Sequence, residues 1–293
     1  MHDAAYYIDL LLSGVTVGSL YALIAIGYTM VYGILRLINF AHGDIFMMAG
    51  FFMVYAATWM PMAVCIPLVL IATVALGVLI EKAAYSPLRT APRMSVMISA
   101  IGVSYLLQNI ALLIFGADTK SFSSVVPLQN IKIGGITITG VTVVAVLACI
   151  VIMIGLMIFI KKTKAGQAML AVSEDKDAAQ LMGVNVNGTI SLTFAIGSGL
   201  AAIAGVLLCS AYPTLTPYTG SMPGIKAFTA AVFGGIGSIP GAFIGGILLG
   251  IIEILGKAYI SSQLSDAIVF AVLIIVLLVK PTGILGKPIH EKV

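Results

Sequence analysis

Charged residues are scarce in this chain. They make up 9% of its 293 residues, whereas soluble proteins carry roughly 25%. Hydrophobic residues account for 60%. A chain with so few charges cannot cover a water-facing surface, which excludes a soluble globular protein. The composition predicts an all-α, polytopic membrane protein, because backbone groups in lipid must find their hydrogen bonds within the spanning segment.

Several features of other protein classes are also missing. The few cysteines lie in apolar segments without the spacing of metal ligands, so we expect them to pack in the interior: Cys65, Cys149 and Cys209. No basic stripe with interleaved aromatic residues indicates a nucleic acid partner. The nearest approach to a phosphate-binding loop starts at Gly250, has one residue too many between its glycines and ends in Ala258 rather than a hydroxyl residue. We therefore expect no catalytic residues and no cofactor, and any energy from ATP must arrive through a partner.

Apolar runs divide the sequence into helix-length segments. They occupy approximately 10–35, 45–60, 62–81, 94–115, 141–160, 189–211, 227–256 and 266–280. A membrane-spanning helix needs about 20 residues, so the run at 45–60 is short. The run at 227–256 is too long and contains "GGIGSIPGAFIGG". We expect about eight to ten transmembrane or half-spanning helices, with broken helices near 36–44 and 234–241.

The loop charges predict an orientation. Lysine and arginine concentrate in cytoplasmic loops of membrane proteins, and here they form three groups: Lys82, Arg89 and Arg93; Lys161, Lys162 and Lys164; and Lys280, Lys287 and Lys292. The loops at about 116–140 and 212–226 carry little charge and should face outward. With 227–256 counted as an inward leg and a return, the N-terminus is periplasmic and the C-terminus is cytoplasmic.

The first interruption, "RLINFAHGD", places polar residues inside an apolar region. Asn39, His42, Gly43 and Asp44 could form a hinge or gate where the chain turns at the inner face, or could contact a transported substrate. Asp44 precedes an apolar run and is a plausible N-cap for the helix that follows. Arg36 could offset its charge. We favour the turn with capping side chains over direct substrate contact.

The second interruption contains too many helix breakers for one straight helix. The segment includes Gly237, Pro240 and Gly241. Each glycine disfavours a helix by about 1 kcal/mol, and proline removes a backbone hydrogen-bond donor. We predict a non-helical turn over 234–241, packed beside "NFAHGD" on the cytoplasmic side of a pathway. The alternative is a kinked, continuous helix that faces lipid.

Glycines four residues apart predict closely packed helices elsewhere, as at Gly14 and Gly18 and at Gly246 and Gly250. Glu253 lies in the apolar helix that follows the second interruption. Lys257 stands four residues later, so we expect an ion pair within that helix. A proton-coupling role for Glu253 is the alternative.

Residues 161–188 form the longest polar stretch. Small apolar residues alternate there with charged ones at helical spacing, and Gly183 ends the pattern in the manner of a helix C-terminus. We predict a short cytoplasmic helix that docks in a groove of another protein, with these coupling residues: Ala171, Glu174, Asp175, Ala178, Ala179 and Gly183. A helix lying on lipid headgroups is less favoured, because its face carries alanine rather than large apolar residues.

Four motifs together resemble one family. They are "GSLYALIAIGYTMVYGILRLINFAHGD", "AVSEDKDAAQLMGVN", "KAFTAAVFGGIGSIPGAFIGG" and "PTGILG". They resemble the membrane permeases of bacterial ABC importers for branched-chain amino acids, of the LivH type. The resemblance extends from about Gly14 to Lys292 and implies a single transmembrane permease domain over residues 1–293, in the bacterial inner membrane.

The resemblance also implies partners and a substrate. Such a permease pairs with a homologous permease, two cytoplasmic ATP-binding subunits and a periplasmic substrate-binding protein, with membrane lipid around it. The segment 161–188 takes the place of the helix that couples the permease to the ATPase. Leucine, isoleucine and valine are the usual substrates, while related permeases carry urea, short-chain amides or other amino acids. The remaining alternatives are an ion-coupled secondary carrier and a passive channel for a small neutral solute such as urea.

Overall fold

The computed structural model describes residues 4–36, 39–89, 91–121, 124–126, 128–133 and 136–286. The chain is 78% helical. Its α-helices are α1 (Ala4–Leu35), α2 (His42–Ala56), α3 (Met62–Ile80), α4 (Arg93–Phe115), α5 (Gly140–Lys162), α6 (Lys164–Glu174), α7 (Lys176–Leu181), α8 (Val186–Ala211), α9 (Ser221–Gly234), α10 (Ile239–Tyr259) and α11 (Ser265–Val279). A π-helical turn, Glu81–Tyr85, and a 3-10 turn, Ser86–Leu88, extend α3.

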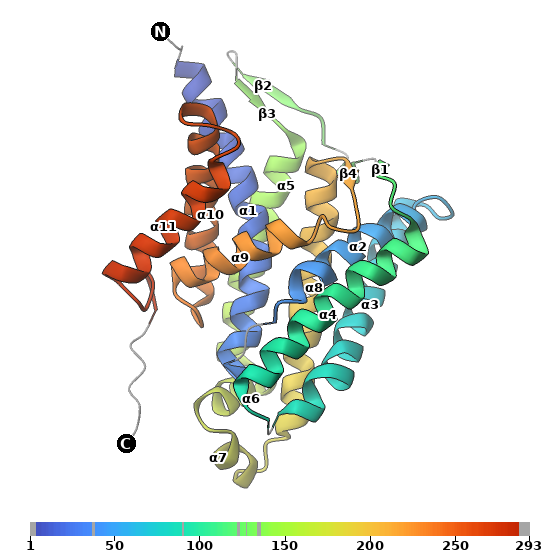
Figure 1. Cartoon of the computed structure of the whole chain (residues 1–293), viewed down its shortest axis with the longest axis vertical. Helices are drawn as coiled ribbons and strands as arrows, with labels where there is room; N and C mark the ends of the chain where they lie inside the picture. The colour runs from blue at the N-terminus through green and yellow to red at the C-terminus, as the bar shows by residue number, and fades with distance from the viewer. Residues whose placement is uncertain are drawn as a thin grey trace.

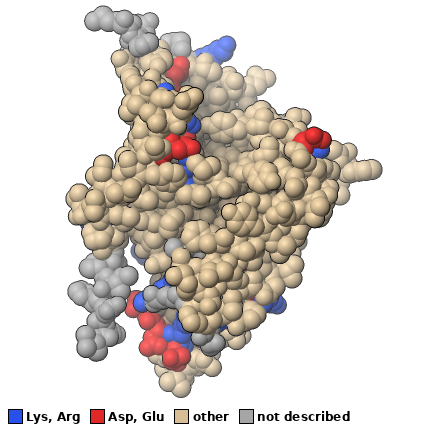
Figure 2. All heavy atoms as spheres, viewed as in Figure 1, with Lys and Arg blue, Asp and Glu red and all other residues tan. Residues whose placement is uncertain are grey.

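Short strands connect some of the helices. β1 (Lys120–Ser121) pairs with β4 (Thr214–Leu215), and β2 (Ile131–Ile133) forms an antiparallel hairpin with β3 (Ile136–Ile138). The hairpin lies at the end of the molecule where α1 starts, and α6 and α7 lie at the opposite end (Figure 1). Charged atoms gather at the α6–α7 end, while uncharged residues cover most of the visible face (Figure 2).

Six helices among the described residues are long and apolar enough to cross a membrane: α1, α3, α4, α5, α8 and α10. Three shorter ones, α2, α9 and α11, have 14 or 15 residues. At 1.5 Å per residue they measure about 21–23 Å, less than the roughly 30 Å hydrocarbon core. Together these nine helices confirm the prediction of eight to ten transmembrane or half-spanning helices.

Two of the three predicted positive groups lie at one end of the bundle, whereas Lys280 of the third group follows α11, away from the α6–α7 end (Figure 1). Arg89, in the first positive loop, donates to the side chain of Asn187 at the start of α8, which places that loop beside the α6–α7 segment. The predicted outward segments at 116–140 and 212–226 are joined through β1 and β4, near the opposite end of the bundle (Figure 1). Residues 221–226 belong to α9 rather than to a loop. The side chain of Arg93, together with Lys287 and Lys292, lies outside the described residues.

Helix α1 forms the centre of the bundle and packs most extensively against α10. Glycines bring the two backbones into contact. A Cβ atom added at Gly250 would lie 2.2 Å from the backbone nitrogen of Gly18, and one at Gly246 would lie 2.5 Å from Cα of Ala22. The small-residue spacing therefore marks a real helix interface, as the sequence predicted.

The first break separates α1 from α2. Helix α1 ends at Leu35, Arg36 adopts a positive φ of 53°, and α2 begins at His42. The prediction that Asp44 caps the new helix is wrong. The helix begins two residues before Asp44, its N-cap is Ala41 without a side-chain bond, and the Asp44 carboxylate instead reaches α4.

The second break separates α9 from α10 and confirms the broken-helix prediction. The turn covers 235–238, and Gly235 and Gly237 have φ values of 108° and 92°. Ser238 caps α10 by accepting a hydrogen bond from the amide of Gly241 at 3.2 Å. Pro240 occupies the first turn of α10, where its missing donor has no consequence. The non-helical part is thus shorter than the predicted 234–241.

The two breaks do not pack in the predicted way. The first lies against the start of α9, where a Cβ atom at Gly43 would lie 2.5 Å from the carbonyl oxygen of Gly220. Gly224 and Gly234 are ten residues apart on α9, which is about 15 Å along a helix. The turn at 235–238 therefore contacts a different region, with Gly33 of α1 on one side and residues 283–286 on the other.

The motif "PTGILG" completes the end of α9. The backbone amides of Ile284 and Leu285 donate to the carbonyl oxygens of Phe233 and Gly234, both at 2.9 Å. The last carbonyls of a helix have no partner within it, and at membrane depth they need one from elsewhere in the protein. A segment about fifty residues further along the sequence supplies these donors.

A buried ion cluster joins α9, α10 and α11. The carboxylate of Glu253 accepts from Lys257 at 2.5 Å, which confirms the predicted pair. It also accepts from Lys226 on α9 at 2.9 Å and from the hydroxyl of Tyr21 at 2.9 Å. Lys226 in turn contacts Asp266 on α11 at 2.6 Å. Two cations and two anions therefore neutralise each other around a carboxylate that is buried in the bundle.

Replacing Gly250 with alanine should destabilise the bundle, because the new Cβ atom would overlap the backbone of Gly18. Overpacking of this kind costs roughly 1–3 kcal/mol. The midpoint of thermal unfolding of the purified protein in detergent measures the effect. Gly102→Ala is the matched control, because nothing lies within 4 Å of its added Cβ atom. Alanine favours helix by about 1 kcal/mol there, so equal destabilisation of both variants would contradict close packing of α1 and α10.

Lys226→Met should destabilise the protein more than Lys257→Met. The side chain of Lys226 is 8% exposed, whereas that of Lys257 is 39% exposed. Breaking a buried pair costs about 3 kcal/mol at the lower end of its range, and an exposed pair within one helix contributes about 0.5 kcal/mol. The comparison uses the same unfolding midpoint. Equal losses would show that burial does not set the strength of the cluster.

Candidate functional site

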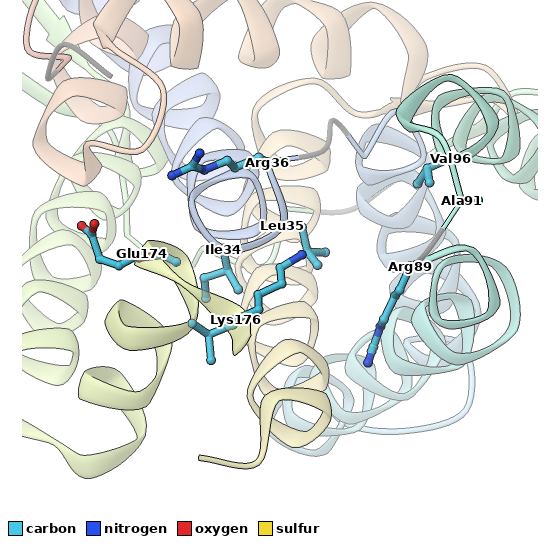
Figure 3. A pocket seen from close by; sticks show the side chains of 10 residues that line it. Ile34, Leu35, Arg36, Arg89, Ala91, Val96, Glu174 and Lys176 are labelled. Atoms are coloured by element: carbon cyan, nitrogen blue, oxygen red, sulfur yellow. The ribbon is translucent and has the colours of Figure 1, made fainter. Parts of the chain in front are cut away.

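A basic cavity lies where α1 ends, beside the α6–α7 segment. We use this name for a cavity of about 350 Å³ whose charged lining residues are Arg36, Arg89, Glu174 and Lys176. They come from the end of α1, the loop after α3, the end of α6 and the start of α7 (Figure 3). Three of the four are cations, so the cavity is electropositive.

The cations of the basic cavity differ in their partners. Arg89 donates to Glu81, which is buried, and to Asn187. Among the described residues, no carboxylate lies within ion-pair distance of Arg36 or Lys176. Partial burial, reinforced by the charges of Arg89 and Arg36, lowers the pKa of Lys176. The start of α7 therefore lies in a positive field produced by the end of α1 and the loop after α3.

The polar segment at 161–188 folds as two helices rather than the single predicted one. Asp175 separates α6 from α7 and accepts from the amides of Asp177 and Ala178 at 2.9 and 3.0 Å. Asp175 is thus an N-cap, which the sequence prediction missed. Gly183 has a φ of 84° and follows the end of α7, as predicted for a C-terminal glycine.

One face of this segment is fixed to the bundle and the other projects. Val172 and Ala179 are buried, and α6 and α7 both contact α8. Glu174, Asp175 and Ala178 are exposed, and Ala171 is partly buried. The burial of Ala179 corrects the expectation that an alanine face is presented to a partner.

The projecting tip is apolar. Leu181 is 89% exposed and Met182 is 85% exposed. They stand at the end of α7, the helix at the far end of the molecule (Figure 1). Large apolar side chains at a tip that extends beyond the spanning helices suit a groove in another protein. The predicted coupling residues include neither Leu181 nor Met182.

The first break is held by buried polar contacts. The hydroxyl of Tyr85 donates to Oδ1 of Asn39 at 2.5 Å. The ring of His42 packs edge-on against Tyr28, with centroids 4.7 Å apart, and a Cβ atom at Gly27 would lie 2.4 Å from its Nε2. These contacts fix both sides of the turn between α1 and α2.

A second cavity, which we call the Asp44 cavity, opens between α2, α4 and α9. Its volume is about 180 Å³. Asp44 accepts from the hydroxyl of Ser104 and from Nε2 of Gln108 at 3.0 Å. Gln108 thus makes a hydrogen bond between α4 and α2. The neighbouring Asn109 instead donates to the carbonyl of Tyr105 in its own helix.

The predicted site residues thus fall into three places. Asn39, His42, Gly43 and Asp44 lie together against the start of α9. Gly237, Pro240 and Gly241 lie at the other end of α9, and the coupling residues lie beyond the basic cavity. Sequence reasoning missed Ser104, although it stands four residues before Gln108 and therefore shares a helix face with it. It also missed Lys226, whose signal was a single lysine at the start of an apolar run.

The comparisons with known proteins agree across the chain. Residues 10–277 match the family described as the permease component of the branched-chain amino acid transport system. The high-affinity branched-chain amino acid transport system permease protein LivH of Salmonella typhimurium is 46% identical over 98% of each chain. The corresponding protein BraD of Pseudomonas aeruginosa is 43% identical over the full length of both chains.

A solved structure supports the fold alone. PsaBC from Streptococcus pneumoniae, in complex with Fab, has a TM-score of 0.50 and 13% sequence identity, covering 94% of this chain and 92% of that chain. Identity at this level carries no information on substrate.

The matches also define the class of transporter. The chain is a multi-pass membrane protein related to bacterial inner-membrane permeases. ATP hydrolysis resides in partner subunits, and a binding protein belongs to the same kind of system. With a family match over residues 10–277 and near-full-length relatives above 40% identity, this chain belongs to the LivH/BraD-type family of branched-chain amino acid ABC permeases.

Proposed function

We propose that this chain moves branched-chain amino acids across the bacterial inner membrane as the permease of an ATP-driven importer. The observation that carries the proposal is the 46% identity, over 98% of the chain, to a high-affinity branched-chain amino acid permease. The broken helices at membrane depth support it, because such breaks in transporters lie along the substrate pathway. The absence of a phosphate-binding loop in the sequence means that ATP must act through other subunits.

The proposed assembly contains four kinds of component. A single permease domain over residues 1–293 pairs with a homologous permease, two cytoplasmic ATP-binding subunits and a periplasmic substrate-binding protein, with membrane lipid around the bundle. The N-terminus is periplasmic in this arrangement and the C-terminus cytoplasmic. Support comes from the positive groups at 82–89 and 161–164, which lie at the α6–α7 end of the molecule, away from the start of α1 (Figure 1).

In the proposed mechanism, the tip of α7 is the point of coupling. Leu181 and Met182 enter a groove on an ATP-binding subunit, and the residues around them complete the contact: Ala171, Glu174, Asp175, Ala178 and Gly183. Because α6 and α7 pack on α8, and α6 also on α1, movement of the tip reaches the first break. Lys176 and Arg36 line the same basic cavity. A change of charge in that cavity therefore acts on both α7 and the end of α1.

The two breaks act as hinges in this proposal. Asn39, His42, Gly43 and Asp44 define the first, and Gly237, Pro240 and Gly241 the second. Helix α9 connects them, since its first turn touches Gly43 and its last turn touches Gly241. A shift of α9 therefore moves both breaks together and opens or closes the pathway.

Uptake by the reconstituted importer tests the function. Proteoliposomes containing this chain, its partner permease and both ATP-binding subunits should accumulate radiolabelled leucine when ATP and the binding protein are present. An ATP-binding subunit that cannot hydrolyse ATP is the control and should abolish uptake. Leucine uptake by this chain alone, without ATP, would favour an ion-coupled carrier or a passive channel and would contradict the proposal.

Leu181→Asp should uncouple ATP hydrolysis from transport. A charge at this position cannot enter an apolar groove without losing its hydration, so we expect leucine uptake and its stimulation of ATP hydrolysis to fall at least about tenfold. Uptake and phosphate release by the same proteoliposomes measure this.

Gln180→Asp is the matched control for that variant. Gln180 precedes Leu181 on α7, is exposed and is already polar, so the same new charge should have little effect there. Comparable losses in the two variants would indicate general repulsion by the charge rather than apolar docking.

A further inference from the structure

Three carboxylates are buried in the described part of the bundle, and one of them differs from the others. Glu253 has two lysines within ion-pair distance, and Glu81 has Arg89. Asp44 is 1% exposed, yet among the described residues no lysine, arginine or histidine lies within 4.0 Å of its carboxylate. An ionisable group at membrane depth normally faces a partner or a water-filled cavity. Asp44 faces a cavity.

The walls of the Asp44 cavity are mostly apolar. Its aromatic and aliphatic lining residues are Tyr28, Phe40, Ile101, Tyr105, Ile225 and Phe228. A water molecule needs roughly 10–15 Å³ of such volume, so about 180 Å³ has room for a small organic molecule. Apolar walls around a few convergent polar groups are the usual composition of a small-molecule site.

Hydrogen bonds hold the Asp44 carboxylate in place without neutralising it. Ser104 donates to Oδ2, and Gln108 donates to Oδ1. Each carboxylate oxygen can accept more than one hydrogen bond, so acceptor capacity remains toward the cavity. Neither donor carries a charge, and a cation in the cavity would therefore be bound by an unopposed anion.

The opposite side of the cavity offers the complementary charge. Gly220 and Ser221, at the start of α9, line it, and α9 has no side-chain cap. The amides of Ser221 and Gly224 donate to backbone carbonyls and Pro223 has no N–H, so the positive end of α9 consists of the Met222 amide and the helix dipole. The first amides of a helix carry a partial positive charge and attract anions. The cavity thus combines an anion on α2, a weakly positive helix end on α9 and apolar walls between them.

We infer that the Asp44 cavity is a binding site for a zwitterionic amino acid within the membrane. The Asp44 carboxylate binds the ammonium group, the first turn of α9 faces the carboxylate, and the branched side chain packs against Ile101, Ile225 and Phe228. Ser104 and Gln108 are positioning residues that orient Asp44. This inference rests on the proposed function and adds the residues that would bind the substrate.

Side chains around the opening of the Asp44 cavity are exposed in the single chain, and a substrate site there explains why. Tyr105 is 62% exposed, and Ile101 and Ile225 are each 42% exposed. A carboxylate-bearing cavity that opened onto lipid would be unfavourable. The face of α4 and α9 that carries the opening therefore lines the pathway in the assembled importer rather than the lipid.

Asp44→Asn removes the charge while keeping the size and shape of the side chain. One of the two acceptor oxygens becomes an NH2 donor, which the hydroxyl of Ser104 can accept by rotating. In the complete importer, the rate of leucine uptake should fall about tenfold or more, because a desolvated charge pair is lost. Co-purification of the ATP-binding subunits shows whether the variant still assembles. Uptake at the wild-type rate by an assembled Asp44→Asn importer would overturn the inference.

Protection from a thiol reagent tests the chemistry of the ligand. Ile101→Cys places a reactive group in the cavity wall, and Ile98→Cys on the same helix is the control, since Ile98 is 64% exposed and does not line the cavity. The native cysteines are buried. In the permease–ATPase complex without binding protein, millimolar leucine and 3-methylbutylamine should slow labelling of the Ile101→Cys variant, whereas 4-methylpentanoate, which lacks the ammonium group, should not.

The outcomes separate this inference from the proposed function. Protection that disappears with Asp44→Asn and is absent from the Ile98→Cys control supports the site. Equal protection by 4-methylpentanoate, protection that survives Asp44→Asn, or no protection in a complex that takes up leucine normally would overturn it. Absence of leucine uptake by the wild-type importer would instead overturn the proposed function, and this assignment with it.

Discussion

The contact between the backbones of α1 and α10 is the constraint on which the rest of the bundle depends. Lipid provides no hydrophobic drive for helix association, so helices in membranes are held by close packing and polar contacts. Glycines such as Gly18 and Gly250 let α1 and α10 touch without intervening side chains. Because α1 leads into the first break and α10 follows the second, this contact fixes where both breaks lie. Tyr21 on α1 then reaches Glu253 and adds a polar contact to the same interface.

Each break is stable because distant residues supply what the local sequence lacks. The open end of α9 receives two hydrogen bonds from residues 284 and 285. Asn39 receives one from Tyr85, which follows α3. Such contacts hold irregular backbone at membrane depth, where water cannot satisfy it.

Local features of the sequence predicted the parts of the structure that depend on neighbouring residues. Polar residues located the first break, glycine and proline content located the second, and the spacing of Glu253 and Lys257 predicted their ion pair. Two other contacts join residues that are far apart in sequence. Lys226 contacts Glu253, and Asp44 contacts Gln108 on α4. No periodicity encodes such pairs, so the cap predicted for Asp44 was wrong. The prediction that the second break packs beside the first was wrong for the same reason. The length of α9 separates the two breaks.

The distribution of charge in the bundle links stability to transport. Burying a charge is unfavourable unless a partner compensates for it, and Glu253 and Glu81 have such partners within the chain. Those carboxylates hold helices together. Among the described residues Asp44 has only neutral donors, and in the proposed site the ammonium group of the substrate supplies the compensating charge. Sorting buried carboxylates by the source of their neutralising charge therefore separates those that stabilise the fold from the one that can bind a cargo.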